Sequence, residues 1–176
     1  MKSLSPFIIQ DLQNIILDYI TPRKQRYNLN EIIRTKNMLL FQILSKEEKK
    51  KLYHGTLNEC GILIMDYAAE QGYLEVVKWL HKNGCQATFR AMDYAAAKGY
   101  LEIVKWLHEN RKEGCTVWAM NWSAENGHLE IIKWLHENRT EGCSSSAVEY
   151  AAENGHLFIV KWLFENHKEC YYRFVC

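Results

Sequence analysis

Hydrophobic and polar positions along this chain repeat in blocks of 27–28 residues. The segment GYLEVVKWLH at 72–81 returns with few changes at 99–108, 127–136 and 155–164. One tryptophan marks each block, at Trp79, Trp106, Trp134 and Trp162, with spacings of 27, 28 and 28 residues. A period of this size indicates units that bury their apolar faces against one another. We therefore expect an all-α helical solenoid of four repeats.

Each block predicts a pair of helices. In the first block, Met65, Ala68, Ala69 and Gly72 have the i, i+3, i+4, i+7 spacing of one helical face. A short inner helix should end at the glycine, which tolerates the left-handed backbone of a helix C-cap. The outer helix that follows carries an apolar stripe that includes Trp79. We expect the tryptophans to be buried between layers, because burial of a large indole is strongly stabilising.

These residues carry a family resemblance. The segment AAAKGYLEIVKWL at 95–107 resembles the ankyrin-repeat core, Ala-Ala-x-x-Gly-His-Leu-Glu-Val-Val-Lys-x-Leu, and four blocks agree in phase. The resemblance covers residues 62–172 and implies ankyrin-like repeats within 61–172, at about 62–88, 89–116, 117–144 and 145–172. The later units look most like the ankyrin arrays of giant amoeba-infecting DNA viruses. The resemblance implies a non-catalytic protein–protein interaction module. It implies that the module binds a protein partner on the concave surface formed by the inner helices, and that this partner is a host protein if the chain is viral.

The chain departs from the ankyrin pattern in two ways. Its period is shorter than the usual 33 residues, and the missing residues fall between the outer helix and the next inner helix. We therefore expect shortened hairpin loops there. The usual Thr-Pro-Leu-His opening is also absent, since RAMD stands at 90–93 and WAMN at 118–121. We expect the hydrogen bonding of that threonine and histidine to be lost.

Comparison of the blocks separates framework positions from variable ones. Trp, Leu, Gly and Ala positions hardly change, whereas the ends of the inner helices and the connecting positions vary. A partner could be recognised at such variable positions, although drift between units explains the variation equally well. The candidate partner-binding residues are Phe89, Arg90, Lys98, Val117, Trp118, Asn126 and Asn154.

Residues 1–60 do not repeat and predict a small helical N-terminal region. One amphipathic helix is expected up to Thr21-Pro22 and a second from about 29 to 44. The stretch IIQDLQNIILDYI at 8–20 resembles the opening helix of an F-box, which implies an alternative function as a substrate adaptor of a ubiquitin ligase. The competing interpretation is a cap that covers the first repeat. At the other end, residues 173–176 are expected to form a C-terminal tail.

Composition narrows the partner class and the location. The 22 Lys/Arg and 21 Asp/Glu nearly balance, which gives no bias toward nucleic acid or a membrane. The basic excess in residues 1–60 is explained by solvated charge, so we expect no nucleic-acid partner. No apolar stretch approaches the roughly 20 residues of a membrane span, and the N-terminus lacks a signal-peptide layout. We expect an intracellular, cytoplasmic protein, in the host cytoplasm if it is viral.

The cysteines also indicate an intracellular protein. Cys60, Cys115 and Cys143 follow the repeat phase, and repeat-phased thiols about 10 Å apart lie beyond disulfide reach. We expect small buried thiols in a reducing compartment.

Catalytic chemistry is not indicated. His81, His108 and His136 recur one layer apart, too far apart for one metal ion. The chain also lacks a glycine-rich phosphate loop, a Cys-x-x-Cys pair and a nucleophile elbow. We expect no enzymatic activity, no cofactor, no metal and no small-molecule substrate.

Overall fold

A computed structural model of the chain describes residues 33–34 and 63–167. The chain divides into two compact units, Met1–Thr56 and Leu57–Cys176. Ile33 and Arg34 are α-helical, as expected for the helix predicted over 29–44. The cap or F-box-like region otherwise lies outside the described residues, as does the tail at 173–176.

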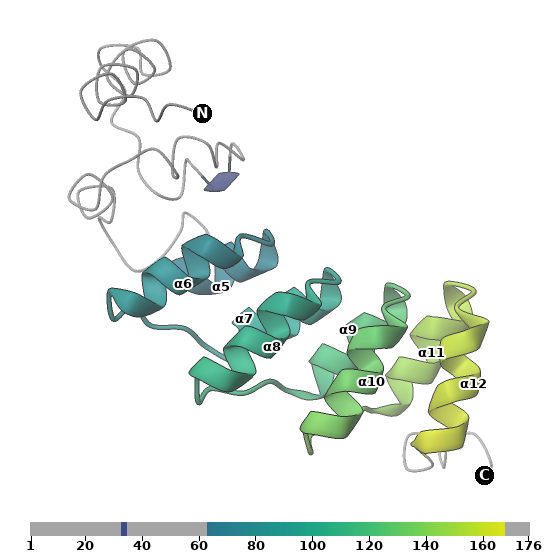
Figure 1. Cartoon of the computed structure of the whole chain (residues 1–176). Helices are drawn as coiled ribbons and strands as arrows, with labels where there is room; N and C mark the ends of the chain where they lie inside the picture. Colours follow the sequence, from purple (N-terminus) through teal and green to yellow (C-terminus); the bar gives the residue numbers. More distant parts are fainter. Residues whose placement is uncertain (1–32, 35–62, 168–176) are drawn as a thin grey trace, which may run out of the picture. The chain divides into compact units, whose positions relative to one another are not determined.

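The second unit is an array of helix pairs (Figure 1). The inner and outer helices alternate along the chain, and successive inner helices make the most extensive contacts. This confirms the expected all-α solenoid. The helices are α5 (Ile64–Glu70), α6 (Leu74–Lys82), α7 (Arg90–Ala97), α8 (Leu101–Asn110), α9 (Val117–Glu125), α10 (Leu129–Asn138), α11 (Ser145–Glu153) and α12 (Leu157–Asn166).

The helix ends follow from local sequence. Gly72, Gly99, Gly127 and Gly155 have positive φ after α5, α7, α9 and α11, as the C-cap prediction requires. Thr116 caps α9 by accepting a 3.2 Å hydrogen bond from the Trp118 backbone N–H. The connections at 83–89, 111–116 and 139–144 are short, and the described residues contain no strand beyond one bridge residue at Leu63. The expectation of shortened loops is confirmed.

The core consists of small and aliphatic side chains. Paired alanines of the inner helices, such as Ala95 and Ala96, are fully buried, as is Leu80 of an outer helix. The Trp column is only half-buried, so the expected full burial was wrong. Trp106, Trp134 and Trp162 each meet a histidine of the preceding layer and leave part of their surface in solvent.

A first interlayer contact joins each outer helix to the next. His81 meets Trp106 edge-to-face at 5.2 Å between ring centroids, and this contact recurs at His108–Trp134 and His136–Trp162. The Arg111 guanidinium donates to His81 Nδ1 at 3.3 Å, and Arg139 does the same to His108 at 3.4 Å. The histidines are therefore packing residues, as the sequence indicated.

A second interlayer contact joins the inner helices. Asp66 accepts hydrogen bonds from the Thr88 backbone N–H at 2.9 Å and from its hydroxyl at 2.6 Å. Asp93 and Thr116 repeat this arrangement in the next layer. In the third layer a neutral pair, Asn121 and Ser144, replaces the aspartate and threonine. The Ser144 backbone N–H donates to Asn121 Oδ1 at 3.0 Å, and the Asn121 side-chain amide donates to the Ser144 hydroxyl at 2.8 Å. Although the ankyrin Thr–His bonding is missing, a different hydrogen bond ties each layer to the next.

One expectation about the cysteines is wrong. Cys115 is free and buried, as predicted, and Cys85, which does not follow the repeat phase, is free and buried too. Burial raises the pKa of Cys115 to about 12. Cys143, however, is disulfide-bonded. The separation of about 10 Å applies only to cysteines of neighbouring repeats, and the partner of Cys143 is not among the described residues. Because disulfides are uncommon in the cytosol, the cysteines no longer support the predicted cytoplasmic location.

Candidate functional site

The inner-helix face is the side of α5, α7, α9 and α11 that no other described helix covers. On α9, Ala119, Met120, Asn121, Ser123 and Ala124 are buried. Trp118 is 40% exposed and Trp122 is half-buried. The remaining turn of this face carries Glu125 and Asn126. The packing of the layers therefore leaves one line of side chains per inner helix available to a partner.

An aromatic column runs along this face. Its members occupy one equivalent position in each repeat and are half-buried: Tyr67, Tyr94, Trp122 and Tyr150. Trp122 stacks on Tyr94 of the preceding repeat, with ring centroids 5.7 Å apart and planes inclined by 20°. Trp118 stacks on Trp122 at 5.2 Å and 29°. These three rings form a platform, which we call the aromatic platform.

A column of carboxylates lies three residues beyond the aromatic column. Glu70, Glu125 and Glu153 occupy it in α5, α9 and α11, and Ala97 in α7. In the described part of the chain, none of these glutamates has an ion pair.

The outer helices differ in this respect. Glu75, Glu102 and Glu130 are paired with lysines at 2.9, 3.3 and 3.0 Å. The first turns of these three outer helices are therefore locally neutralised, whereas the last turns of α5, α9 and α11 are not.

The seven candidate residues all lie on inner helices or at their ends. Phe89 is the N-cap of α7 and 44% exposed, Arg90 opens that helix, and Lys98 is its C-cap. Val117 opens α9, and the neighbouring Trp118 joins the aromatic platform.

Asn126 and Asn154 already have a local structural role. Their side-chain amides donate to the Trp122 and Tyr150 carbonyls at 2.8 and 2.9 Å. These contacts cap the C-terminal ends of α9 and α11, so local structure explains both asparagines.

Sequence reasoning missed the aromatic column. The signal was present, because an aromatic residue stands one position before the conserved Ala-Ala or Ser-Ala pair of every block. The stacking of Trp122 on Tyr94 requires the structure, because it depends on adjacent layers, whereas Trp118 and Trp122 meet at the i, i+4 spacing of one helix.

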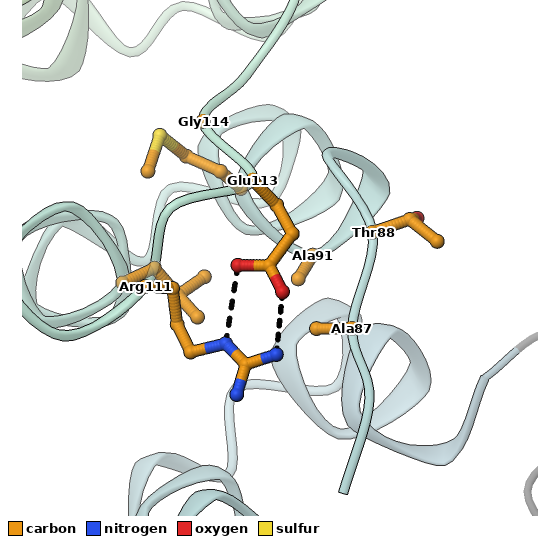
Figure 2. A pocket seen from close by; sticks show the side chains of 8 residues that line it. Ala87, Thr88, Ala91, Arg111, Glu113 and Gly114 are labelled. Carbon is orange, nitrogen blue, oxygen red and sulfur yellow. Dashed lines mark hydrogen bonds and ion pairs between the residues drawn. The ribbon is translucent and has the colours of Figure 1, made fainter.

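Two pockets of the described region are repeat crevices. The first has an empty volume of about 180 Å³ that includes open solvent. Figure 2 shows this crevice, in which Glu113 receives two hydrogen bonds from Arg111 beside Thr88 and Ala91. Burial, the largest single effect, disfavours the ionised form of Glu113, but the hydrogen bonds and charge of Arg111 together with the backbone N–H groups of Lys112 and Glu113 outweigh it, and the pKa lies below its usual value. An equivalent crevice of about 160 Å³ occurs one repeat later, beside Arg139 and Glu141. Its recurrence identifies it as a packing feature.

Metal-binding geometry is not present among residues 63–167, where no three His, Cys, Asp or Glu side chains are grouped to hold an ion. His136 Nδ1 and His167 Nε2 lie 2.8 Å apart. This pair occupies the place that arginine and histidine fill in earlier layers. None of the helices described is long and apolar enough to cross a bilayer.

Stacked helix pairs with a regular hydrogen-bonded layer contact define a helical repeat protein. A family model for ankyrin repeats in three copies matches residues 29–121 and 92–173. The chain therefore belongs to the ankyrin-repeat family. Members of this family are generally protein-interaction modules and not enzymes. No curated protein matches the chain.

Proposed function

We propose that the chain binds a protein partner through the inner-helix face, with the aromatic platform at its centre. The observation that carries this proposal is the exposed Trp118 stacked on Trp122. Tryptophan and tyrosine are enriched among residues that dominate binding energy, and a pre-stacked ring loses little conformational freedom on binding. Phe89, Arg90, Lys98 and Val117 surround the platform as secondary contacts.

A catalytic role has no comparable support. The crevices are open packing features, and the described titratable groups are used between layers or are exposed. The similarity of the later repeats to arrays of amoeba-infecting viruses supports a host protein as the partner and the host cytoplasm as its location.

The alternative is a ubiquitin-ligase adaptor, in which residues 8–44 contact the ligase and the repeats hold a target. The ankyrin match begins at residue 29, so it includes part of that segment. This favours an additional repeat-like layer or cap over an adaptor. Recovery of ligase-core subunits with the full chain would reverse that preference.

The test compares two surfaces of the same protein. Full-length chain, Trp118→Ala and the outer-helix control Glu102→Ala are immobilised, and retained host proteins are quantified by mass spectrometry. We expect a partner that the unaltered chain and Glu102→Ala retain and that Trp118→Ala loses. Equal retention by both variants, with unchanged melting temperatures, would show that the inner-helix face is not the binding surface.

A further inference from the structure

The inner-helix face carries charge that the described part of the chain leaves unpaired. Glu125 and Glu153 lie at the ends of α9 and α11, and neither has an ion pair among the described residues. The glutamates in the first turns of two outer helices, Glu102 and Glu130, are instead matched by lysines three residues away. A cation of a partner would meet the inner glutamates without displacing an ion pair of the described region.

The aromatic rings and these carboxylates lie on common lines. Trp118, Trp122 and Glu125 are spaced i, i+4, i+7 on α9, which places them on one side of that helix. Ser146, Tyr150 and Glu153 have the same spacing on α11. Neither line contains a lysine or arginine. A side chain that lies along either line would contact an aromatic ring, and its end would reach the carboxylate that lies one helical turn beyond the ring.

We propose that the α9–α11 half of the inner-helix face binds a partner segment through its arginine side chains. This inference rests on the proposed function and specifies the partner's chemistry. An arginine guanidinium is planar, stacks on aromatic faces and donates hydrogen bonds to a carboxylate in the same plane. One arginine lies against the aromatic platform and pairs with Glu125, and a second lies beside Tyr150 and pairs with Glu153.

The geometry of the array sets the spacing of the two arginines. Neighbouring packed helices are about 8–10 Å apart, so equivalent positions on α9 and α11 are separated by about that distance. A polyproline II segment has three residues per turn and rises about 3.1 Å per residue, so residues three apart point the same way at about 9 Å. An extended Arg-x-x-Arg segment that crosses the two inner helices fits both lines.

The repeat before α9 limits how far the arginine residues of the partner segment can extend along the face. Arg90 and Lys98 are exposed on α7, and α7 has Ala97 where its neighbours have glutamate. These two cations repel a third arginine and favour a neutral or acidic residue at that end of the segment. The direction of the segment is therefore selected by charge.

The experiment measures binding of fluorescent peptides to the full chain by anisotropy. The probes are Gly-Ser-Arg-Gly-Ser-Arg-Gly-Ser, its lysine version and its glutamate version. We expect the arginine peptide to bind, the lysine peptide to bind roughly two- to fivefold more weakly because it loses ring stacking, and the glutamate peptide not to bind. Salt should weaken the arginine complex.

Matched variants separate the site from general surface charge. Glu125→Gln and Glu153→Gln should each weaken the arginine peptide by roughly two- to fivefold and reduce its salt dependence. Glu75→Gln, which removes an outer-helix carboxylate, should leave it unchanged. Equal binding of the arginine and lysine peptides, or equal losses in Glu75→Gln and Glu125→Gln, would overturn the proposal.

Failure here is distinguishable from failure of the proposed function. If Trp118→Ala loses the captured partner while the arginine peptide does not bind, the inner-helix face remains the interaction surface and the arginine chemistry is wrong. If the Trp118→Ala variant still retains the partner, the inner-helix face is not the binding surface.

Discussion

Single residues at one repeat position show how this array tolerates different chemistry. Asp93 and Asn121 occupy equivalent buried sites, and both bind the residue that caps the next inner helix. Burial raises the pKa of Asp93, although the hydrogen bonds from Thr116 oppose the shift. Asp93 therefore places an ionisable carboxyl group at a buried position where the neutral amide of Asn121 makes an equivalent hydrogen-bonded contact one layer later.

Asp93→Asn should leave stability at pH 7 unchanged or raise it. Because the folded-state pKa is raised, the contribution of Asp93 is full below about pH 3.8 and declines as pH rises through its folded value. The benefit of asparagine should therefore shrink on acidification. Urea unfolding at several pH values tests this.

Asp93→Ala is the informative control. It leaves the Thr116 N–H without its partner and should cost about 1–3 kcal/mol. If alanine were tolerated as well as asparagine, the interlayer hydrogen bond would not contribute to stability.

His128 gives the array a sensitivity to mild acid. Burial lowers its pKa; the hydrogen bond with the Ala97 backbone opposes this shift and His156 adds to it. The unfolded chain therefore takes up the proton first. Stability should be full above about pH 6.5 and fall as pH decreases through the lowered folded value.

His128→Tyr should reduce this acid sensitivity. The exchange is matched within the chain, because Tyr100 occupies the equivalent place over Gly72 and His128 lies over Gly99. The reverse change, Tyr100→His, should increase the sensitivity. Melting temperatures between pH 5 and 8 measure both, and identical profiles for His128→Tyr and the unaltered protein would contradict the assignment.

At the scale of elements, the turn between inner and outer helix holds two layers together. Gly99 has φ +85°, and a Cβ there would lie 2.8 Å from the His128 ring of the next repeat. Gly84 has φ +74° but nothing within 4 Å of such a Cβ. A side chain would be strained by the left-handed backbone at either glycine, but only at Gly99 would its Cβ also meet a side chain of the neighbouring layer.

Gly84→Ala should cost about 1–2 kcal/mol for the left-handed backbone alone. Gly99→Ala should cost more, because it also displaces His128. Chemical unfolding measures the loss of unfolding free energy in each variant, and the difference between the two losses is the contribution of the interlayer contact. Equal losses would mean that the histidine moves aside without penalty.

At the scale of the whole array, stability comes from contacts between neighbouring layers. Trp106 is half-buried and meets His81 of the preceding layer. Trp106→Ala should cost about 2–3 kcal/mol, less than the 3–5 of a fully buried aromatic. Circular dichroism should show one transition at a lower temperature. Two separate transitions would show that the layers on either side unfold independently.

Truncation tests how far the array extends toward the N-terminus. The ankyrin match starts at residue 29, so removal of residues 1–28 should leave the melting temperature of the repeats nearly unchanged. Removal of residues 1–44 cuts into the matched region and should lower it or cause aggregation. A soluble 45–176 fragment with an unchanged melting temperature would instead favour the adaptor interpretation.

The sequence by itself determined the helix pairs, their boundaries and the solenoid. Glycine spacing, paired alanines and one leucine stripe per block are local signals, and each repeats four times. Tertiary structure alone decided which side chains meet across layers. The His–Trp contacts, the Asp–Thr bonds and the Tyr94–Trp122 stack join residues 22–28 positions apart, and only the stacking of layers fixes their distances. For the same reason the tryptophans proved half-buried: composition shows that an indole is large and apolar, but only the neighbouring layer decides how much of it is covered.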